Sequence, residues 1–303
     1  MTAPRRILPG ATAMITRRCT QRQYFLRPDE ETNRIFNYCI AEAASRYEIG
    51  LIAWVVMSNH YHAVVYDPKG QLPKFIEHLH KMLARVLNAR WGRWENLWAT
   101  EETCITYLAT PADVFRKVLY VLSNPFAEHV VDRLVDWPGS SSISHLAGKR
   151  TTECRPDAFF RVGGVMPESV ELQTMLPPDI LAVETAASWE ARMLEAIAEQ
   201  ERTVRKSRME EGRSVLGRKA VLSASPFDSP STREPRRQLR PTIAAQDREQ
   251  RIAELKDLRE FRIAHDMARR RFNAGEHDIE FPIGTYRMRL WGARCATTVP
   301  IAA

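Results

Sequence analysis

The segment that decides the fold is Leu51-Ile-Ala-Trp-Val-Val-Met57, followed by Ser58-Asn59 and then by His60-Tyr-His-Ala-Val-Val-Tyr66. Seven consecutive apolar residues are typical of a central strand that is covered on both faces. The Ser-Asn pair favours a turn, and the residues after it have the pattern of a partner strand. The sequence therefore predicts a β-hairpin over residues 51–66 at the centre of a sheet.

Strand-like and helix-like patterns alternate around this hairpin, from about residue 5 to residue 146. Asp29 and Thr110 stand where the side-chain caps of two helices are expected, and Pro111 suits a first helical position. The other expected elements are strands over 11–16 and 103–108 and helices over 35–47, 72–87 and 110–122. This alternation indicates an α/β or α+β domain rather than a helical bundle.

The C-terminal half has a looser pattern, which begins after the Gly-Ser-Ser-Ser stretch at 139–142. Four prolines among serines and arginines make 223–241 a candidate linker. Helices are expected over 189–209 and 245–272, and a short strand over 281–291 with Arg287 and Arg289 on one face. We therefore expect two domains, 1–150 and 151–303, the second being a mainly helical, partly disordered extension.

The composition fits a globular chain in a reducing compartment. Of its 303 residues, 44% are hydrophobic and 27% are charged, and no apolar run has the length of a membrane span. Five cysteines without CxxC spacing argue against a disulfide framework or a zinc knuckle. The basic start lacks the apolar run of a signal peptide. We expect a cytoplasmic protein without a membrane partner.

Positive charge is concentrated in the C-terminal half. The formal net charge is +7, but residues 201–271 alone hold 19 Lys and Arg against 11 Asp and Glu, so the rest of the chain is close to neutral. A basic excess favours a polyanionic partner such as DNA, with a strong dependence of binding on salt. A solvated helical face next to a linker explains the same charges without a partner.

His60 and His62 are the sharpest chemical signal. Residues i and i+2 of a strand project from one face, so the two imidazoles can share a divalent cation. Two histidines on an exposed hairpin are the alternative. The pair His78 and His80 has the same spacing in a helical pattern, where a rotation of ~200° prevents joint chelation.

Tyr120, Asn124 and Lys117 share one face of the helix that starts at Thr110. A rotation of ~100° per residue places all three away from the apolar stripe of that helix. Pro125 predicts that the helix ends or kinks at Asn124. The trio is either an exposed polar face or part of a site.

The histidines and this trio together suggest phosphodiester chemistry. A cation held by two imidazoles and a carboxamide oxygen can polarise a phosphate, while a phenol acts as the nucleophile. Because an ordinary phenol has a pKa near ~10, the cation or Lys117 must favour the phenolate. The product would be a covalent phosphotyrosine.

At this level of detail the sequence resembles the single-tyrosine HUH transposases, and more narrowly the REP-associated tyrosine transposases of bacteria. The resemblance rests on two motifs, Val56-Met-Ser-Asn-His-Tyr-His62 and Tyr120-Val-Leu-Ser-Asn-Pro125. In that family a histidine pair flanks one apolar or aromatic residue, and the nucleophile lies four residues before Asn-Pro. Arginines at the end of the first strand, the Trp98 region and Asp136-Trp-Pro-Gly-Ser-Ser141 support the match, which covers about residues 5–146.

The resemblance implies a ferredoxin-like antiparallel sheet with helices on one face. It implies that His60, His62 and Asn124 bind Mg²⁺ or Mn²⁺ and that Tyr120 attacks DNA to give a 5′-phosphotyrosine and a free 3′-hydroxyl. No nucleotide cofactor is needed, because the covalent bond stores the energy for rejoining. The implied partner is single-stranded or hairpin DNA at palindromic repeats of the bacterial nucleoid. Phosphate contacts are expected from Arg5, Arg6, Arg17, Arg18, Arg22 and Lys117.

Two departures and two alternatives accompany this interpretation. Phe126-Ala-Glu-His129 replaces the small residue and glycine turn usual after Asn-Pro, and the C-terminal half is longer than in compact members of the family. A hairpin-binding protein with little catalysis has the same fold. A rolling-circle replication initiator or relaxase shares the chemistry but usually has another tyrosine arrangement. The sequence leaves the choice between monomer and homodimer open.

Overall fold

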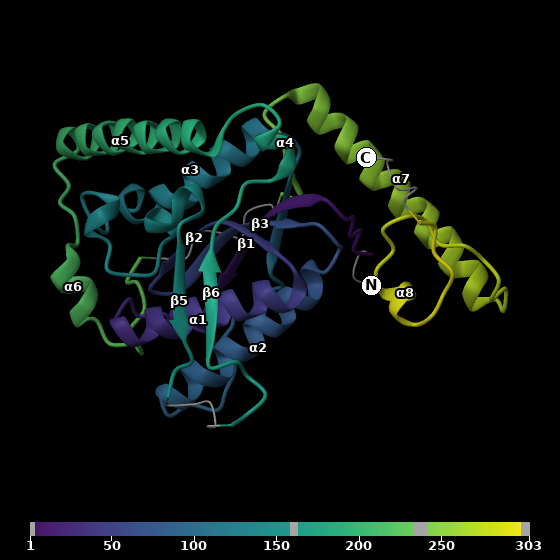
Figure 1. The fold of residues 1–303 in the computed structure, drawn as a ribbon, viewed down its shortest axis with the longest axis horizontal. Helices are drawn as coiled ribbons and strands as arrows, with labels where there is room; N and C mark the ends of the chain where they lie inside the picture. Colours follow the sequence, from purple (N-terminus) through teal and green to yellow (C-terminus); the bar gives the residue numbers. More distant parts are fainter. Residues whose placement is uncertain (1–3, 158–162, 233–240, 298–303) are drawn as a thin grey trace.

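A five-stranded sheet organises the computed structural model, which describes residues 4–157, 163–232 and 241–297 (Figure 1). Its strand order is β2-β3-β1-β4-β7. The strands are β1 (Ala11–Arg18), β2 (Gly50–Met57), β3 (His60–Asp67), β4 (Cys104–Leu108) and β7 (Ile243–Ala244). All neighbours pair antiparallel except β4 and β7, which pair parallel. The predicted α+β class and the predicted hairpin, now β2–β3, are confirmed.

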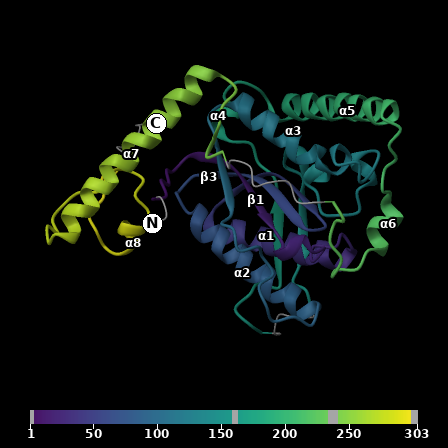
Figure 2. The same ribbon diagram turned by 180° about the vertical axis from the view of Figure 1, so that it is seen from behind.

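Helices α1 (Glu30–Tyr47) and α2 (Leu72–Arg90) cover one face of the sheet, side by side (Figure 2). The predicted cap at Asp29 is confirmed, because its carboxylate accepts a hydrogen bond from the Thr32 amide at 2.9 Å. Alternate residues of the central strands, including Trp54, Tyr61 and Ala63, face these helices and are almost fully buried. This layer is the larger of the two cores.

The opposite face is covered as well, which corrects the expectation of helices on one face only. Helix α3 (Pro111–Ala127) packs on β2 and β3, and α5 (Ala186–Glu210) packs on α3. The physical reason lies in β2 and β3, where Val55, Met57 and Val64 make the second face as apolar as the first. The predicted cap of α3 is confirmed: Thr110 Oγ1 accepts from the Asp113 amide at 3.1 Å.

Residues beyond 150 contribute to both cores. An antiparallel hairpin of β5 (Arg150–Cys154) and β6 (Ser169–Gln173) packs on α1, and Leu172 is fully buried there. Trp189 and Met193 of α5 are buried in the other core. The division near residue 150 stays a prediction, and no break in packing marks it among the described residues.

The two helices expected in the C-terminal half are present as α5 and α7 (Arg248–Asn273), whereas the short strand expected after them is not. The remaining elements are α4 (Pro178–Leu181), α6 (Arg218–Ser223), α8 (Arg287–Leu290) and the 3₁₀ turns Thr20–Arg22, Leu134–Asp136 and Ser142–Gly148. The strand expected over 281–291 is wrong, because residues 287–290 are helical. Gly284 and Gly292, with φ of +83° and +81°, bracket this turn in conformations that no strand adopts. Residues 233–240 of the candidate linker lie outside the described residues.

Candidate active site

His60 and His62 project from β3 toward α3, on one face of the sheet. Their ring centroids are 4.9 Å apart, as expected for residues i and i+2 of a strand. Each Nδ1 atom has a partner: Asn59 Oδ1 accepts from His60 Nδ1 at 2.8 Å, and Thr16 Oγ1 is hydrogen bonded to His62 Nδ1 at 2.7 Å. These bonds orient both rings and favour the Nε2 atoms as ligands.

Both imidazoles are held in the neutral form, which metal ligation requires. Burial lowers the pKa of His60 from 6.5 to about 4, and the charge of Arg18 adds to this shift. Burial also lowers the pKa of His62 well below its usual value, helped by the charges of His60 and Lys117. Hydrogen bonding to Asn124 opposes the shift at His62.

Tyr120 lies over this histidine pair. Its ring centroid is 5.5 Å from that of His62, although the two residues are distant in sequence and stand on different elements. The phenol ring is 46% exposed, and Lys117 Nζ lies 5.2 Å from its centroid. Burial raises the pKa of the Tyr120 phenol, and hydrogen bonding to Asn124 opposes that increase. The chain by itself therefore keeps this phenol protonated at neutral pH.

Asn124 joins the tyrosine to the histidine. It is 5% exposed, and its Nδ2 donates to the carbonyl oxygen of Tyr120 at 2.8 Å, so Oδ1 is the atom left for a ligand role. Of the end or kink expected at Asn124, the end is wrong, because α3 continues to Ala127 with Pro125 inside it, and the kink stays a prediction. Pro125 stands in the last turn, where only one main-chain bond is lost, and burial of Phe126 holds that turn on the core.

The donor set suits a divalent cation. Two imidazoles and one amide oxygen combine ligands of the kinds preferred by transition metals and by Mg²⁺ or Mn²⁺. Within 4–157, 163–232 and 241–297, no cluster of three or more His, Cys, Asp or Glu side chains could hold a metal ion.

The basic residues expected to contact DNA do not all meet at this site. Arg18 and Lys117 act on the histidines through their charges. The others hold protein groups in the structure: Arg5 pairs with Glu102 at 3.9 Å, Arg6 with Asp257 at 2.5 Å, Arg17 donates to the Glu101 carbonyl, and Arg22 donates to the Thr232 carbonyl at 2.6 Å. Their contact with DNA stays a prediction.

Thr16, Asn59 and Cys104 belong to the site, although the sequence did not single them out. Thr16 pairs with His62 across β1 and β3 and with Cys104 across β1 and β4. The side chains of Thr16, His62 and Cys104 therefore point to the α3 face in one row. The charge of Cys104 also influences the Tyr120 phenol. Asn59 could have been found from the sequence, because its carboxamide directly precedes His60. Thr16 and Cys104 could be found only from the register of the sheet.

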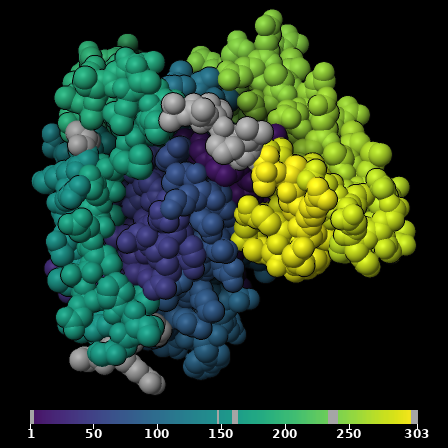
Figure 3. Space-filling model, turned by 45° about the vertical axis from the view of Figure 1, so that its right-hand side comes forward, coloured from purple at the N-terminus to yellow at the C-terminus, as the bar shows by residue number. Residues whose placement is uncertain are grey.

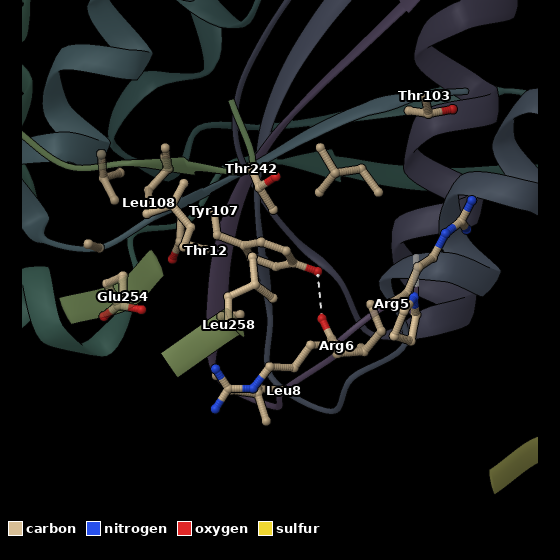
Figure 4. Close-up of a pocket in the computed structure, with 18 of the residues that line it drawn as sticks. Arg5, Arg6, Leu8, Thr12, Thr103, Tyr107, Leu108, Thr242, Glu254 and Leu258 are labelled. Atoms are coloured by element: carbon tan, nitrogen blue, oxygen red, sulfur yellow. Dashed lines mark hydrogen bonds between the residues drawn. The ribbon is translucent and has the colours of Figure 1, made fainter. Parts of the chain in front are cut away.

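A well-formed cavity lies elsewhere. It has a volume of about 530 Å³ and lies between the N-terminal segment, β4 and α7 (Figure 4). Arg5, Arg6, Tyr107 and Leu258 are among its lining residues, and Tyr107 Oη donates to the Arg6 carbonyl at 3.3 Å. None of His60, His62, Tyr120 and Asn124 lines it.

Comparison with known proteins finds one family model that matches part of the chain. Residues 12–117 match the family model described as IS200-like transposase. This segment is therefore similar to the IS200-like transposases. The matched segment contains His60, His62 and Lys117 and ends three residues before Tyr120. No curated protein matches the sequence.

Two solved structures resemble this chain in part. One is described as a REP-associated tyrosine transposase bound to a REP hairpin, with 18% identity and a TM-score of 0.41 over 54% of this chain and 99% of that chain. The other is a putative transposase from Deinococcus radiodurans, with 19% identity and a TM-score of 0.28 over 35% of this chain and 84% of that one. None of the described helices is long and apolar enough to cross a membrane.

Proposed function

We propose that this transposase relative nicks and rejoins single-stranded DNA at hairpins through a 5′-phosphotyrosine on Tyr120. The observation that carries the proposal is the meeting of Tyr120 with His62, at 5.5 Å between ring centroids, from a helix and a strand far apart in sequence. An exposed polar helix face would have no reason to hold a phenol over two oriented imidazoles. The same activity would place the protein on DNA in the bacterial cytoplasm.

In the proposed reaction Tyr120 Oη forms a bond to phosphorus while the bond between phosphorus and the 3′ oxygen breaks. The phenol loses its proton, and the departing oxygen takes up a proton to become a 3′-hydroxyl. Because the energy of the broken phosphodiester is kept in the phosphotyrosine, attack by a 3′-hydroxyl reverses the step and rejoins DNA. The open surface around Tyr120 suits a strand that must enter and leave.

The chain's own groups position this reaction. Thr16 and Asn59 orient the imidazoles, and Asn124 holds the end of α3 against His62. His60 and His62 with Asn124 Oδ1 would hold Mn²⁺ or Mg²⁺, which when bound supplies Lewis acidity toward the phosphate and lowers the pKa of a nearby phenol. Lys117 Nζ lies 5.2 Å from the centroid of the Tyr120 ring.

Single-stranded DNA is the substrate class that the surface fits best. A strand with unpaired bases needs cationic groups for its phosphates and exposed rings for stacking. Trp94, in the loop after α2, is 90% exposed and offers such a ring. The basic segment 201–271 would add sequence-independent affinity, with the salt dependence usual for phosphate contacts.

The test is a covalent adduct. Wild-type protein incubated with hairpin DNA that carries a 3′ label or a 5′ label, with Mn²⁺, should form an adduct stable to denaturation only with the fragment that keeps the 5′ phosphate. Tyr120→Phe should lose the adduct and nicking completely while hairpin binding changes little, because only the nucleophilic oxygen is removed. Tyr47→Phe, on α1 across the sheet, is the matched control and should keep both activities.

The two alternatives predict other outcomes. A hairpin-binding protein without catalysis would bind the DNA equally well with and without Mn²⁺ and form no adduct in wild type. A rolling-circle initiator or relaxase with a second nucleophile would keep some adduct in Tyr120→Phe. Adduct formation that is unchanged in Tyr120→Phe would refute the proposed nucleophile.

A further inference from the structure

Residues 241–247, which contain β7 and lead into α7, are attached to both β4 and α3. The amide of Tyr107 on β4 donates to the Thr242 carbonyl at 2.8 Å. The Gln246 amide donates to Asp113 Oδ1 in the first turn of α3 at 2.9 Å. Figures 1 and 3 show α7 and α8 as an arm beside the main sheet. This segment of the C-terminal half therefore lies directly beside the helix that carries the proposed nucleophile.

A groove with a volume of about 440 Å³ lies between α3 and this segment. It is lined from both sides, by Asp113, Arg116 and Lys117 of α3 and by Arg251 at the start of α7 among others. Lys117 also lies next to the candidate active site, because its Nζ atom is 5.2 Å from the centroid of the Tyr120 ring. The groove therefore begins beside Tyr120 and leads away from it toward the C-terminal half.

The groove has a net positive charge. Asp113 is the only acid among the described residues that line it, and it is 2% exposed. Its carboxylate already accepts hydrogen bonds from Arg116 and from the Gln246 amide. Lys117 and Arg251 have no ion-pair partner among the described residues. Two unpaired cations that face one groove favour an anionic ligand.

The arrangement fits a single strand of DNA. Lys117 is on the side of the nucleophile and Arg251 is on the opposite wall, so a ligand that contacts both carries negative charges along its length. The backbone of a single strand is such a ligand, and cationic grooves commonly follow it. A volume of about 440 Å³ is in the range of pockets for drug-sized molecules, which is the scale of a nucleotide rather than of a duplex.

We propose that this groove holds the backbone of the DNA strand next to the scissile phosphate, and that Arg251 contacts one of its phosphates. The strand runs from Tyr120 past Lys117 to Arg251. The C-terminal half then contributes to the DNA site through a defined contact and not only through its net charge. This inference rests on the proposed cleavage at Tyr120, because that reaction brings a strand to the start of the groove.

Binding of hairpin DNA without metal tests the groove, with probes that are bare or carry a single-stranded flank of about ten nucleotides. The flank is on the 5′ side in one probe and on the 3′ side in another, because the groove takes the strand on one side of the scissile phosphate. Wild-type protein should bind one flanked hairpin more tightly than the bare one. Fluorescence anisotropy gives the ratio of the two dissociation constants, which measures the preference for the flank.

Arg251→Gln should lower this preference about fivefold at ~0.1 M salt, because each phosphate contact to a single strand contributes about 0.7 to the slope of log K against log salt. The slope measured with the flanked hairpin should become shallower by the same amount, about 0.7. Binding of the bare hairpin should change little, since the groove is then empty.

Arg269→Gln is the matched control. Arg269 is exposed on the same side of α7, five turns and about 27 Å further along, and it does not line the groove. A charge at that distance acts alike on both probes, so Arg269→Gln should leave the preference for the flank unchanged. Circular dichroism shows whether α7 stays folded in each variant.

Three results would overturn the groove. They are a wild-type chain that prefers neither flank, an Arg251→Gln chain that keeps the wild-type preference, and an Arg269→Gln chain that loses the preference as Arg251→Gln does. These results do not depend on cleavage, which the adduct on Tyr120 tests separately. A chain that forms no adduct and still shows the preference that depends on Arg251 would refute the cleavage reaction and leave the groove as a binding site.

Discussion

His60-Tyr-His62 and His78-Leu-His80 have the same spacing and opposite outcomes. On β3 the first pair projects to one side, with ring centroids 4.9 Å apart. On α2 the second pair separates: His78 Nε2 lies 2.6 Å from Glu42 Oε2, whereas His80 Nε2 is 2.7 Å from Tyr61 Oη in the core. The backbone period, and not the residue types, decides which pair can share a ligand.

The comparison also shows what completes a site. His60 and His62 keep their Nε2 atoms toward Tyr120 and α3, because Asn59 and Thr16 occupy the Nδ1 atoms. The Nε2 atoms of His78 and His80 instead have partners within the protein, Glu42 Oε2 and the buried hydroxyl of Tyr61. A histidine pair on a strand becomes chemically useful only when the neighbouring strand orients it.

The largest effect is expected from breaking the strand pair. His60→Ala or His62→Ala should reduce nicking of hairpin DNA by more than about 100-fold, the loss usual for removing even an outer partner of a metal ligand. Calorimetric Mn²⁺ binding should disappear with it, while hairpin binding without metal persists. His78→Ala is the matched control, because it removes an imidazole of the same spacing without touching the site. Metal-dependent nicking that survives in both strand variants would refute the ligand assignment.

A smaller effect is expected from Thr16, which is not a ligand. Thr16→Val keeps the shape of the side chain but removes the hydrogen bond to His62 Nδ1, so Mn²⁺ affinity should fall about 10-fold to 100-fold. Thr16→Ser should restore most of the affinity. Thr12→Val, at a buried position on the same face of β1, should leave the Mn²⁺ affinity unchanged. If Thr16→Val binds Mn²⁺ as wild type does, the threonine has only a packing role.

The sequence predicted the elements that local chemistry specifies. The hairpin over β2 and β3 followed from an apolar run and a Ser-Asn turn, and Asp29 and Thr110 cap their helices as expected. The grouping of Tyr120 with Asn124 followed from the helical period alone. In each case the decisive residues lie within a few positions of one another, so their geometry does not depend on the rest of the fold.

The errors concern features that distant segments decide. Phe281–Trp291 has a strand-like pattern, but Gly284 with φ of +83° turns the chain before α8. The apolar second face of β2 gave no indication that α3 would cover it, since a buried run is compatible with cover from any element. Thr16 could not be found without the register between β1 and β3. These features depend on pairing across long sequence separations.

The smallest predicted effect concerns His80 of the helical pair and the pH dependence of stability. Burial lowers the pKa of His80 from 6.5 to about 3, so the neutral ring accepts from Tyr61 Oη in the folded chain. Between the pKa of about 6.5 in the unfolded chain and about 3 in the folded chain, His80 takes up a proton only when the chain is unfolded. The free energy of unfolding therefore decreases as pH falls from about 6.5 toward 3.

His80→Gln keeps a group that can accept the tyrosine hydroxyl but cannot titrate. Its Tm, measured by calorimetry without metal, should therefore fall less steeply below pH 6.5 than that of wild type, by about 2–4 °C for each pH unit. Above pH 7, where the histidine is neutral in both states, the two proteins should keep a constant difference in Tm. Parallel curves through pH 5 would mean that His80 is protonated in the folded chain, and that the core around Tyr61 admits water.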